Sequence, residues 1–131
     1  MSPRTVSTKE IQSTLRLPGP DRYNYFIKYI ADTEEAWGLW DDGWAMGKDD
    51  YDRPTFPIWP AREYAALCAD GPWSNYEPTG IPVQELIHEL LPMLDEDGIQ
   101  PSIFRTPEGD AVIPTVPQIL TDLTNEMSRY E

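Results

Sequence analysis

The segment of residues 36–59 constrains the fold more than any other, because it holds four of the five tryptophans. Its sequence is AWGLWDDGWAMGKDDYDRPTFPIW, in which two aromatic runs flank an Asp-Asp-Gly turn and a third run follows an acidic loop. Aromatic runs separated by turn residues are typical of antiparallel strands. The segment therefore predicts a three-stranded antiparallel unit that forms a sheet core. Pro57 cannot donate to a ladder, so the third strand is expected at a sheet edge or with a bulge.

The length of the chain predicts one hydrophobic core. A domain of 131 residues buries roughly two-thirds of the surface that its unfolded chain exposes. Aromatic residues make up 11% of the sequence and concentrate apolar area in large side chains. Since no repeat or linker composition divides the chain, we expect a single domain over residues 21–131, preceded by an N-terminal arm of residues 1–20.

Helical signals lie on both sides of the tryptophan segment. In the arm, Ser7 and Glu10 have the spacing of a capping box and predict a short capped helix over residues 7–17. Apolar stripes at helical spacing predict further helices from residue 20, over residues 60–69, from residue 82 and from residue 115. Pro92 removes a backbone donor, so the helix from residue 82 is expected to kink or to end near Leu91.

The remaining segments predict turns and a second hairpin. Residues 99–105 and 111–113 are β-type runs joined by a proline- and glycine-containing turn at residues 106–109. Residues 73–80 have the composition of a packed loop. Two hairpin-like units with helices between and after them predict an α+β domain, with helices packed on a small mixed or antiparallel sheet.

The strongly acidic composition narrows the choice of partner. The formal net charge is −13, which opposes binding to nucleic acid or to an anionic membrane and favours a basic protein or a cation. Solubility by itself also explains such a charge. Cys68 is the single cysteine, so no intrachain disulfide can form. Because the sequence has no signal peptide and no bilayer-length apolar run, we expect a cytoplasmic protein, as a monomer or a weak homo-oligomer.

No catalytic or metal-binding pattern stands out. Cys68 lies on the apolar stripe of its helix, whereas His88 points away from the stripe of its own, so the two are not expected to pair as nucleophile and base. The acidic clusters at residues 41–42, 49–52 and 95–97 lack the pattern of a calcium loop, and one histidine with one cysteine cannot build a zinc site. We therefore expect no metal and no cofactor.

One candidate surface for a ligand or partner combines Trp44, Trp59, Arg62 and Glu77. Trp59 leaves its strand just before a helix N-terminus with free backbone N–H groups, and Arg62 lies in the first helical turn. These residues predict a small pocket for an anion or a peptide, provided that Trp59 is exposed. The alternative is that Trp59 packs in the core and Arg62 pairs with a local carboxylate.

A series of short motifs carries a resemblance to a known family. In order, the motifs are WGL at residues 37–39, DGWA at 42–45, PIWP at 57–60, EYA at 63–65, EP at 77–78, IP at 81–82, LP at 91–92, DG at 97–98 and FRTP at 104–107. Together they resemble the bacterial Domain of Unknown Function 2750 family over roughly residues 22–125. The resemblance implies a small cytoplasmic bacterial α+β domain and supplies no catalytic or binding residues.

The absence of catalytic motifs favours a non-enzymatic module that binds a protein or a small ligand. Two alternatives stay open. The first is an immunity or antitoxin-like inhibitor of a basic toxin, because complementary charge accelerates such association. The second is a small hydrolase acting on a sugar or nucleotide-like substrate, with Glu63 and Glu77 as candidate carboxylates.

Overall fold

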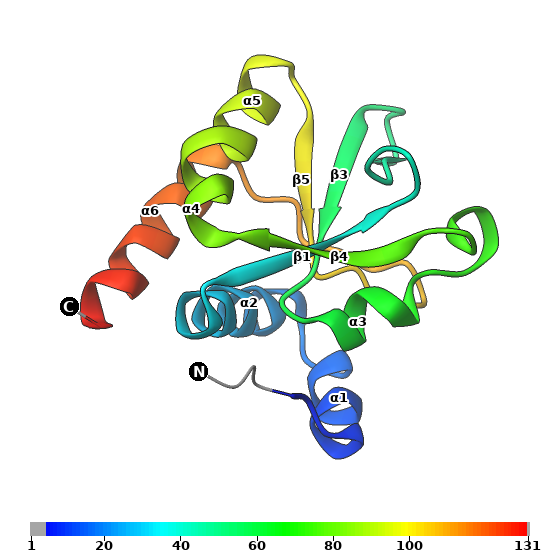
Figure 1. Cartoon of the computed structure of the whole chain (residues 1–131), viewed down its shortest axis with the longest axis horizontal. Coiled ribbons are helices and arrows are strands. Elements are labelled where there is room, and N and C mark those ends of the chain that lie inside the picture. The colour runs from blue at the N-terminus through cyan, green and yellow to red at the C-terminus, as the bar shows by residue number, and fades with distance from the viewer. Residues whose placement is uncertain (1–4, 131) are drawn as a thin grey trace.

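The computed structural model describes residues 5–130 and arranges them as two small sheets with helices packed around them (Figure 1). This confirms the predicted α+β class and the single compact domain. No helix within residues 5–130 is both long enough and apolar enough to cross a bilayer. The helices are α1 (Thr8–Leu15), α2 (Gly19–Thr33), α3 (Arg62–Leu67), α4 (Val83–Glu85), α5 (Leu91–Glu96) and α6 (Val116–Met127), with short 3₁₀ turns at Gly71–Trp73 and Ser128–Tyr130.

Five strands form the two sheets. They are β1 (Glu35–Trp40), β2 (Gly47–Lys48), β3 (Pro54–Ile58), β4 (Glu77–Pro82) and β5 (Gln100–Ile103). Strands β1 and β4 pair antiparallel over their whole length, while β3 lies between antiparallel β2 and parallel β5. The mixed sheet is thus confirmed. In Figure 1, β1 and β4 run across the ends of β3 and β5.

The predicted three-stranded antiparallel unit is wrong in its pairing. The ladder partner of β1 is β4, in the segment that the sequence predicted to be a loop. Within the tryptophan segment, β1 makes only isolated bridges, between Trp40 and Trp44 and between Trp37 and Trp59. The sequence of β4, EPTGIP, contains residues that are depleted in strands but tolerated at a sheet edge. Local composition therefore concealed the strand.

The expected position of Pro57 at a sheet edge is also wrong, because β3 is the central strand of its sheet. On one side of β3, Thr55 pairs with Gly47 of β2 and Trp59 bridges Trp37 of β1. Pro57 falls between these two contacts, so its missing N–H interrupts no ladder. On the other side, the Phe104 amide donates to the Ile58 carbonyl at 2.9 Å.

The predicted second hairpin is reduced to a single bridge. Ile103 and Val112 exchange backbone hydrogen bonds of 2.7 and 3.0 Å, but the ladder of β5 is the parallel one with β3. The turn at residues 106–109 is present as predicted, since the Gly109 amide donates to the Thr106 carbonyl at 2.8 Å. The loop after β5 is thereby held close to the sheet.

The helix N-caps predicted from the sequence are present in the structure. Ser7 accepts from the Glu10 amide and Thr115 from the Gln118 amide, so both predicted N-caps are confirmed. The helix from residue 83 continues through Pro92 to Glu96 by way of a π-helical segment at Leu86–Leu90. The Leu91 amide donates to the Leu86 carbonyl, five residues back. This wider turn lies directly before Pro92, whose missing N–H removes an ordinary helical bond.

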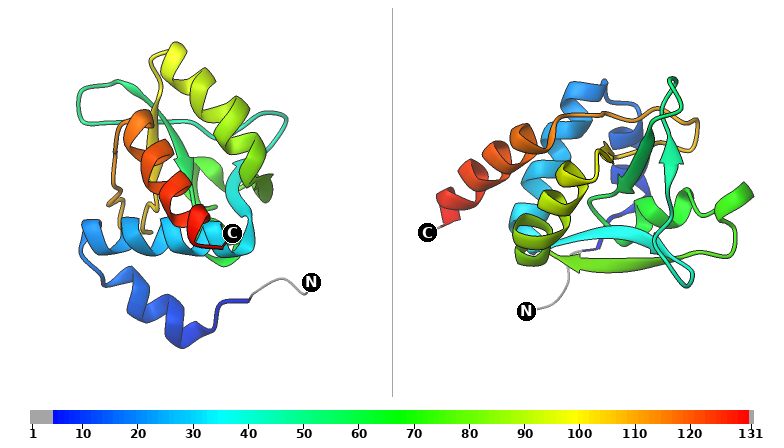
Figure 2. Two further views of the ribbon diagram at one scale, coloured as in Figure 1. Left: turned by 90° about the vertical axis from the view of Figure 1, so that its left-hand side faces the viewer. Right: turned by 90° about the horizontal axis from the view of Figure 1, so that it is seen from above.

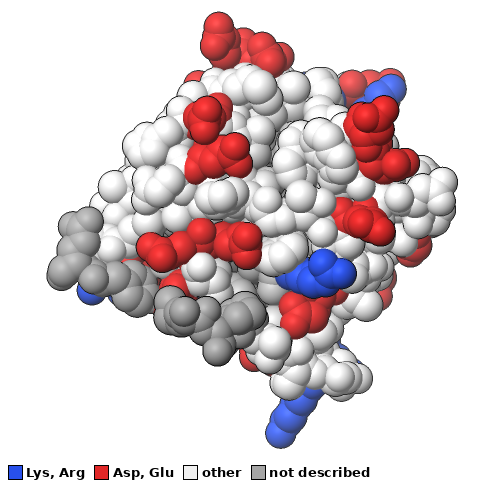
Figure 3. Space-filling model, in the orientation of Figure 1, with Lys and Arg blue, Asp and Glu red and all other residues white. Residues whose placement is uncertain are grey.

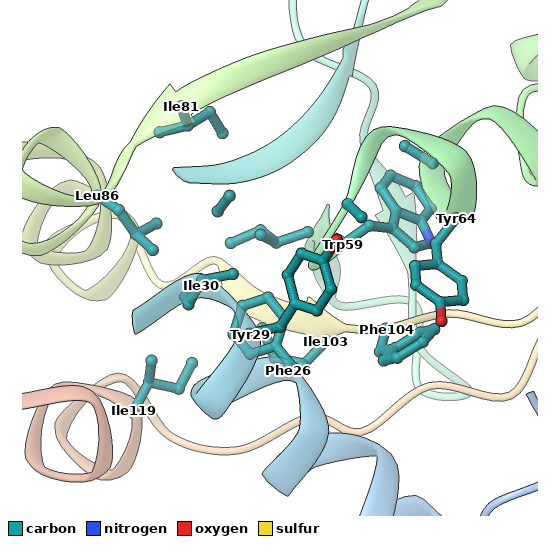
Figure 4. Packing of buried hydrophobic residues seen from close by; sticks show 14 of the residues in the cluster. Phe26, Tyr29, Ile30, Trp59, Tyr64, Ile81, Leu86, Ile103, Phe104 and Ile119 are labelled. Atoms are coloured by element: carbon teal, nitrogen blue, oxygen red, sulfur yellow. The ribbon is translucent and has the colours of Figure 1, made fainter. Parts of the chain in front are cut away.

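The core lies where α2, α6 and the helix of residues 83–96 meet the strands. Figure 4 shows side chains from these elements pointing toward one another around β5. Complete burial of a large apolar side chain stabilises the fold by about 1.5–3 kcal/mol. The fully buried side chains at the centre of the core are Phe26, Ile30, Trp59, Leu86, Ile103, Phe104 and Ile119.

The N-terminal arm packs on the domain through α1, which lies outside α2 in the left view of Figure 2. The Val6 amide donates to Glu63 Oε2 at 3.0 Å, and the Tyr25 hydroxyl donates to Glu10 Oε2. The hydroxyls of Tyr25 and Tyr64 lie 3.0 Å apart. These contacts attach the arm to α2 and α3.

Candidate functional site

The predicted surface of Trp44, Trp59, Arg62 and Glu77 depends on an exposed Trp59, and the structure buries that residue. Trp59 is 0% exposed, and its indole N–H donates to the Arg105 carbonyl at 2.9 Å. The indole is thus committed to the core and cannot contact a ligand. The prediction of that surface is therefore corrected, because Trp59 is a core residue.

The other three residues lie on separate elements. Trp44 is half-buried and packs its ring against Trp40 and Phe56, with centroid distances of 5.0 and 5.8 Å. Arg62 is exposed at the start of α3, and Glu77 is exposed at the start of β4. The structure brings Trp44 and Glu77 next to Trp40, through the Trp40–Trp44 bridge and the Trp40–Glu77 pair of the β1–β4 ladder, whereas Arg62 comes from α3.

The residues considered as catalytic candidates take part in packing or in contacts with other parts of the fold. Glu63 accepts the Val6 amide and so holds the N-terminal arm. Cys68 is buried at the end of α3, and His88 is exposed, with its Nε2 3.1 Å from Gln84 Oε1. Among residues 5–130, no three His, Cys, Asp or Glu side chains are grouped as metal ligands.

The concave feature with the most distinctive chemistry is a pair of cavities that share Arg105, which we call the Arg105 cleft. One cavity, the apolar chamber, measures about 250 Å³ and is lined by Met46, Gly47, Cys68, Asp70, Pro72, Trp73, Thr106 and Pro107 besides Arg105. The other, the polar chamber, measures about 300 Å³ and is lined by Lys48, Asp49, Asp50, Thr55, Ser102, Gly109, Asp110, Ala111 and Ile113 besides Arg105.

Arg105 is positioned by the residue before it and by its own carbonyl. Phe104 is buried and has a left-handed backbone, with φ of 54°, which turns the chain directly after β5. The Arg105 carbonyl accepts hydrogen bonds from Trp59 Nε1 at 2.9 Å and from Cys68 Sγ at 3.3 Å. The carbonyl is thus anchored in the core, while the side chain borders both chambers.

The guanidinium of Arg105 stacks on an aromatic ring and has no ion-pair partner within residues 5–130. Its Cζ lies 5.1 Å from the ring centroid of Trp73, within the range of a cation–π contact. The ion pairs among residues 5–130 join Arg53 to Asp49 and Arg129 to Glu126, and none of them includes Arg105. Lys48 and Arg62 also lack an ion-pair partner among residues 5–130, so what distinguishes Arg105 is that it borders both chambers.

Buried hydroxyl residues form part of the polar chamber. Thr55 and Ser102 come from the adjacent strands β3 and β5, and their register places them on the same face of the sheet. They are only 5% and 6% exposed, and neither hydroxyl has a hydrogen-bond partner among the described residues. Both residues line the cavity, so their polar atoms are available to a ligand.

The carboxylates of the polar chamber are not equivalent. Asp49 accepts hydrogen bonds from the backbone of Tyr51 and from the backbone and side chain of Arg53. Desolvation raises the pKa of Asp49, but these hydrogen bonds and the Arg53 charge together lower it. Asp50 and Asp110 line the same cavity without an ion-pair partner among residues 5–130. Together with Asp70, which lines the apolar chamber, they are the carboxylates of the Arg105 cleft that remain open to a ligand.

The Cys68 thiol borders the apolar chamber in its neutral form. Desolvation by burial raises its pKa to about 11, which outweighs the opposing effects of Trp59 and Arg105. The thiolate is the nucleophilic form of cysteine, so this thiol is held inactive near neutral pH. The geometry assigns it to packing and to the hydrogen bond with the Arg105 carbonyl.

The raised pKa of Cys68 predicts a loss of stability in alkali. The unfolded thiol ionises near pH 9 and the folded one near 11, so this contribution to stability is fully present below pH 9 and is lost as pH rises through 11. Urea unfolding at pH 8 and at pH 10.5 measures the effect. Wild type should lose more stability between these pH values than Cys68→Ala, which keeps every other titratable group. Equal losses would contradict the assignment.

Sequence reasoning missed Arg105, and the reason is its distance from its neighbours along the chain. The walls of the cleft come from residues 46–50, 68–73 and 102–113, together with Thr55. No spacing rule relates segments so far apart. The single local signal was the FRTP run, in which an arginine follows the last apolar residue of a β-type segment.

The comparison with protein-family models matches residues 23–123 to a family described as "Protein of unknown function (DUF2750)". The matched range includes all five strands and the residues that line the Arg105 cleft, and it leaves α1 outside. The comparisons with curated proteins and with solved structures return no match. The resemblance inferred from the short motifs is confirmed.

Proposed function

The chain belongs to the DUF2750 family, and we propose that it is a ligand-binding module that holds a small organic carboxylate in the Arg105 cleft. One observation carries this proposal: Arg105 lies on the wall of two cavities, stacks on Trp73 and has no carboxylate partner among residues 5–130. The guanidinium presents a planar set of donors that matches a carboxylate in two parallel hydrogen bonds. A ligand carboxylate thus supplies the missing counter-ion.

The apolar chamber fits the rest of such a ligand. Met46, Pro72, Trp73 and Pro107 give it an apolar lining, and its volume of about 250 Å³ accommodates a group the size of a phenyl ring. Binding sites of this kind combine an apolar body with a few polar groups that set orientation. Stacking on Trp73 holds the guanidinium in place before the ligand arrives, which lowers the entropy lost on binding.

The acidic side chains on the face shown in Figure 3 do not single out a toxin-binding surface there. Figure 3 shows Asp and Glu in several separate groups on the face that it presents, with few Lys and Arg between them. An inhibitor of a basic toxin would use one continuous acidic patch, which this face does not display. The hydrolase alternative also lacks support, because Glu63 holds the N-terminal arm.

The test uses 3-phenylpropanoate, a carboxylate with an aromatic group, as the probe. We expect it to bind wild type and to shift the indole N–H signal of Trp73 in an NMR titration. Arg105→Gln should weaken binding about 10- to 100-fold, since a hydrogen bond to a charged group contributes roughly 1.5–3 kcal/mol.

Two controls make the test specific. Arg62→Gln removes an equal charge from an exposed arginine outside the cleft lining and should leave the affinity unchanged. The uncharged probe 3-phenylpropanamide should bind more weakly than the carboxylate. The proposal fails if wild type does not bind 3-phenylpropanoate, or if Arg105→Gln binds it as well as wild type does.

A further inference from the structure

We infer that the ligand of the Arg105 cleft is a free α-amino acid with an aromatic or large apolar side chain, whose ammonium group is held in the polar chamber. This inference rests on the proposed function and adds the second charged group of the ligand. It starts from opposite charges that border one cavity. Arg105 and Asp110 both line the polar chamber, yet no ion pair within 4.0 Å joins them.

The position of Asp110 follows from its backbone. The Thr106 amide donates to the Asp110 carbonyl at 2.8 Å, and the Asp110 amide donates to Thr106 Oγ1 at 3.2 Å. These two bonds hold the turn after Arg105 closed and leave the Asp110 carboxylate uninvolved. Opposite charges that are separated across a cavity are complementary to a ligand with both charges.

An α-amino acid has this pattern because its carboxylate and ammonium group are joined through one carbon atom. The carboxylate meets Arg105, and the adjacent ammonium then lies in the polar chamber with Asp110 and Asp50. Of the carboxylates there, Asp49 is already bound to Arg53, at 2.6 Å. Asp110 and Asp50 are therefore the acceptors that charge complementarity assigns to the ammonium.

The hydroxyl residues of the chamber support the same class of ligand. Thr55 and Ser102 are more than nine-tenths buried, line the cavity and have no hydrogen-bond partner among residues 5–130. A hydroxyl both donates and accepts, so it can bind the carboxylate or the ammonium of one small molecule. Neither hydroxyl oxygen is among the fully buried polar atoms that lack a partner, so both are open to the cavity and accessible to a polar ligand.

The charges also argue against a phosphate ligand. A phosphate group carries more negative charge than a carboxylate, and the chamber offers it Arg105 and Lys48 against the three carboxylates of Asp49, Asp50 and Asp110. The net charge of −13 adds to that repulsion. A zwitterion has no net charge and meets neither penalty. Its side chain enters the apolar chamber beside Trp73 and Met46.

The experiment compares L-phenylalanine with 3-phenylpropanoate, which is the same molecule without the ammonium group. On wild type, we expect L-phenylalanine to bind at least tenfold more tightly. In Asp110→Asn this advantage should fall to threefold or less, while 3-phenylpropanoate keeps or gains affinity because a negative charge has been removed. Asp52→Asn removes an equal charge from an exposed residue outside the cleft lining and should preserve the tenfold preference.

The outcomes separate the two proposals. If 3-phenylpropanoate binds wild type as tightly as L-phenylalanine does, the amino-acid inference is wrong and the proposed carboxylate site stands. If neither probe binds, both are wrong. If Asp110→Asn keeps the full preference, the assigned position of the ammonium is wrong. The wild-type comparison decides the ligand class even if the variant fails to fold, and inorganic phosphate should not compete with either probe.

Discussion

Trp59→Ala is expected to destabilise the domain by about 3–5 kcal/mol, the usual range for removing a buried tryptophan. The side chain is 0% exposed and lies at the point where β1 and β3 meet, since its backbone exchanges hydrogen bonds of 2.8 and 2.9 Å with Trp37. Alanine would leave a large cavity at that junction. Urea unfolding measures the loss of stability.

A matched control uses the exposed Trp40. This side chain is 44% exposed, so Trp40→Ala removes the same atoms with less loss of buried area, and we expect a loss of at most about 1.5 kcal/mol. Equal losses for the two variants would mean that Trp59 is not the core residue described above. That result would reopen the surface predicted from sequence.

The milder change Trp59→Phe tests the link between the core and the cleft. It keeps an aromatic ring but removes the indole N–H that donates to the Arg105 carbonyl at 2.9 Å. With only the weaker Cys68 thiol left as donor, Arg105 is less well positioned. We therefore expect weaker binding of 3-phenylpropanoate than in wild type, although Trp59 does not line either chamber.

Phe104→Ala should also cost about 3–5 kcal/mol, because it removes a large buried ring. The ring is 0% exposed and packs edge-on against Tyr64, with centroids 4.6 Å apart. The backbone is left-handed, with φ of 54°, so alanine keeps the unfavourable conformation while losing the contacts that offset it. Urea unfolding again measures the loss, with Tyr51→Ala as the exposed aromatic control.

Comparison of Phe104→Ala with Phe104→Gly tests the left-handed backbone at this position. In an ordinary strand position, glycine is less stable than alanine by about 0.5–1 kcal/mol. Because glycine adopts positive φ without strain, Phe104→Gly should be at least as stable as Phe104→Ala. If the glycine variant were clearly the less stable of the two, the left-handed turn that directs Arg105 toward the cleft would be contradicted.

The helices illustrate what local sequence predicts well. Ser7 and Thr115 were identified as N-caps by residue type and spacing alone, and both make the expected bond to an amide three residues on. A helix cap and an apolar stripe depend on residues within one or two helical turns, so the residues that make these contacts lie close together in the sequence. The sequence located a disturbance at Pro92, but the helix does not end near Leu91 and instead continues to Glu96 by way of a π-helical segment.

The strand pairing and the cleft illustrate the opposite case. Glu77–Pro82 looks like a loop because it contains proline and glycine, and it becomes a strand because β1 offers it a ladder. Trp59 looked like an exposed edge residue and is buried because Arg105, 46 residues away, accepts its indole N–H. Such contacts depend on which distant segments meet, which no local pattern records.

By itself, the sequence determined the α+β class, the family, the helix caps and the acidic charge of this protein. Each of these follows from composition or from neighbours a few residues apart. Only the tertiary structure decided that Trp59 is core, that Arg105 stacks on Trp73 without a carboxylate partner, and that buried Thr55 and Ser102 share a cavity with it. The physical reason is that a binding site requires side chains from segments that meet only when the core packs.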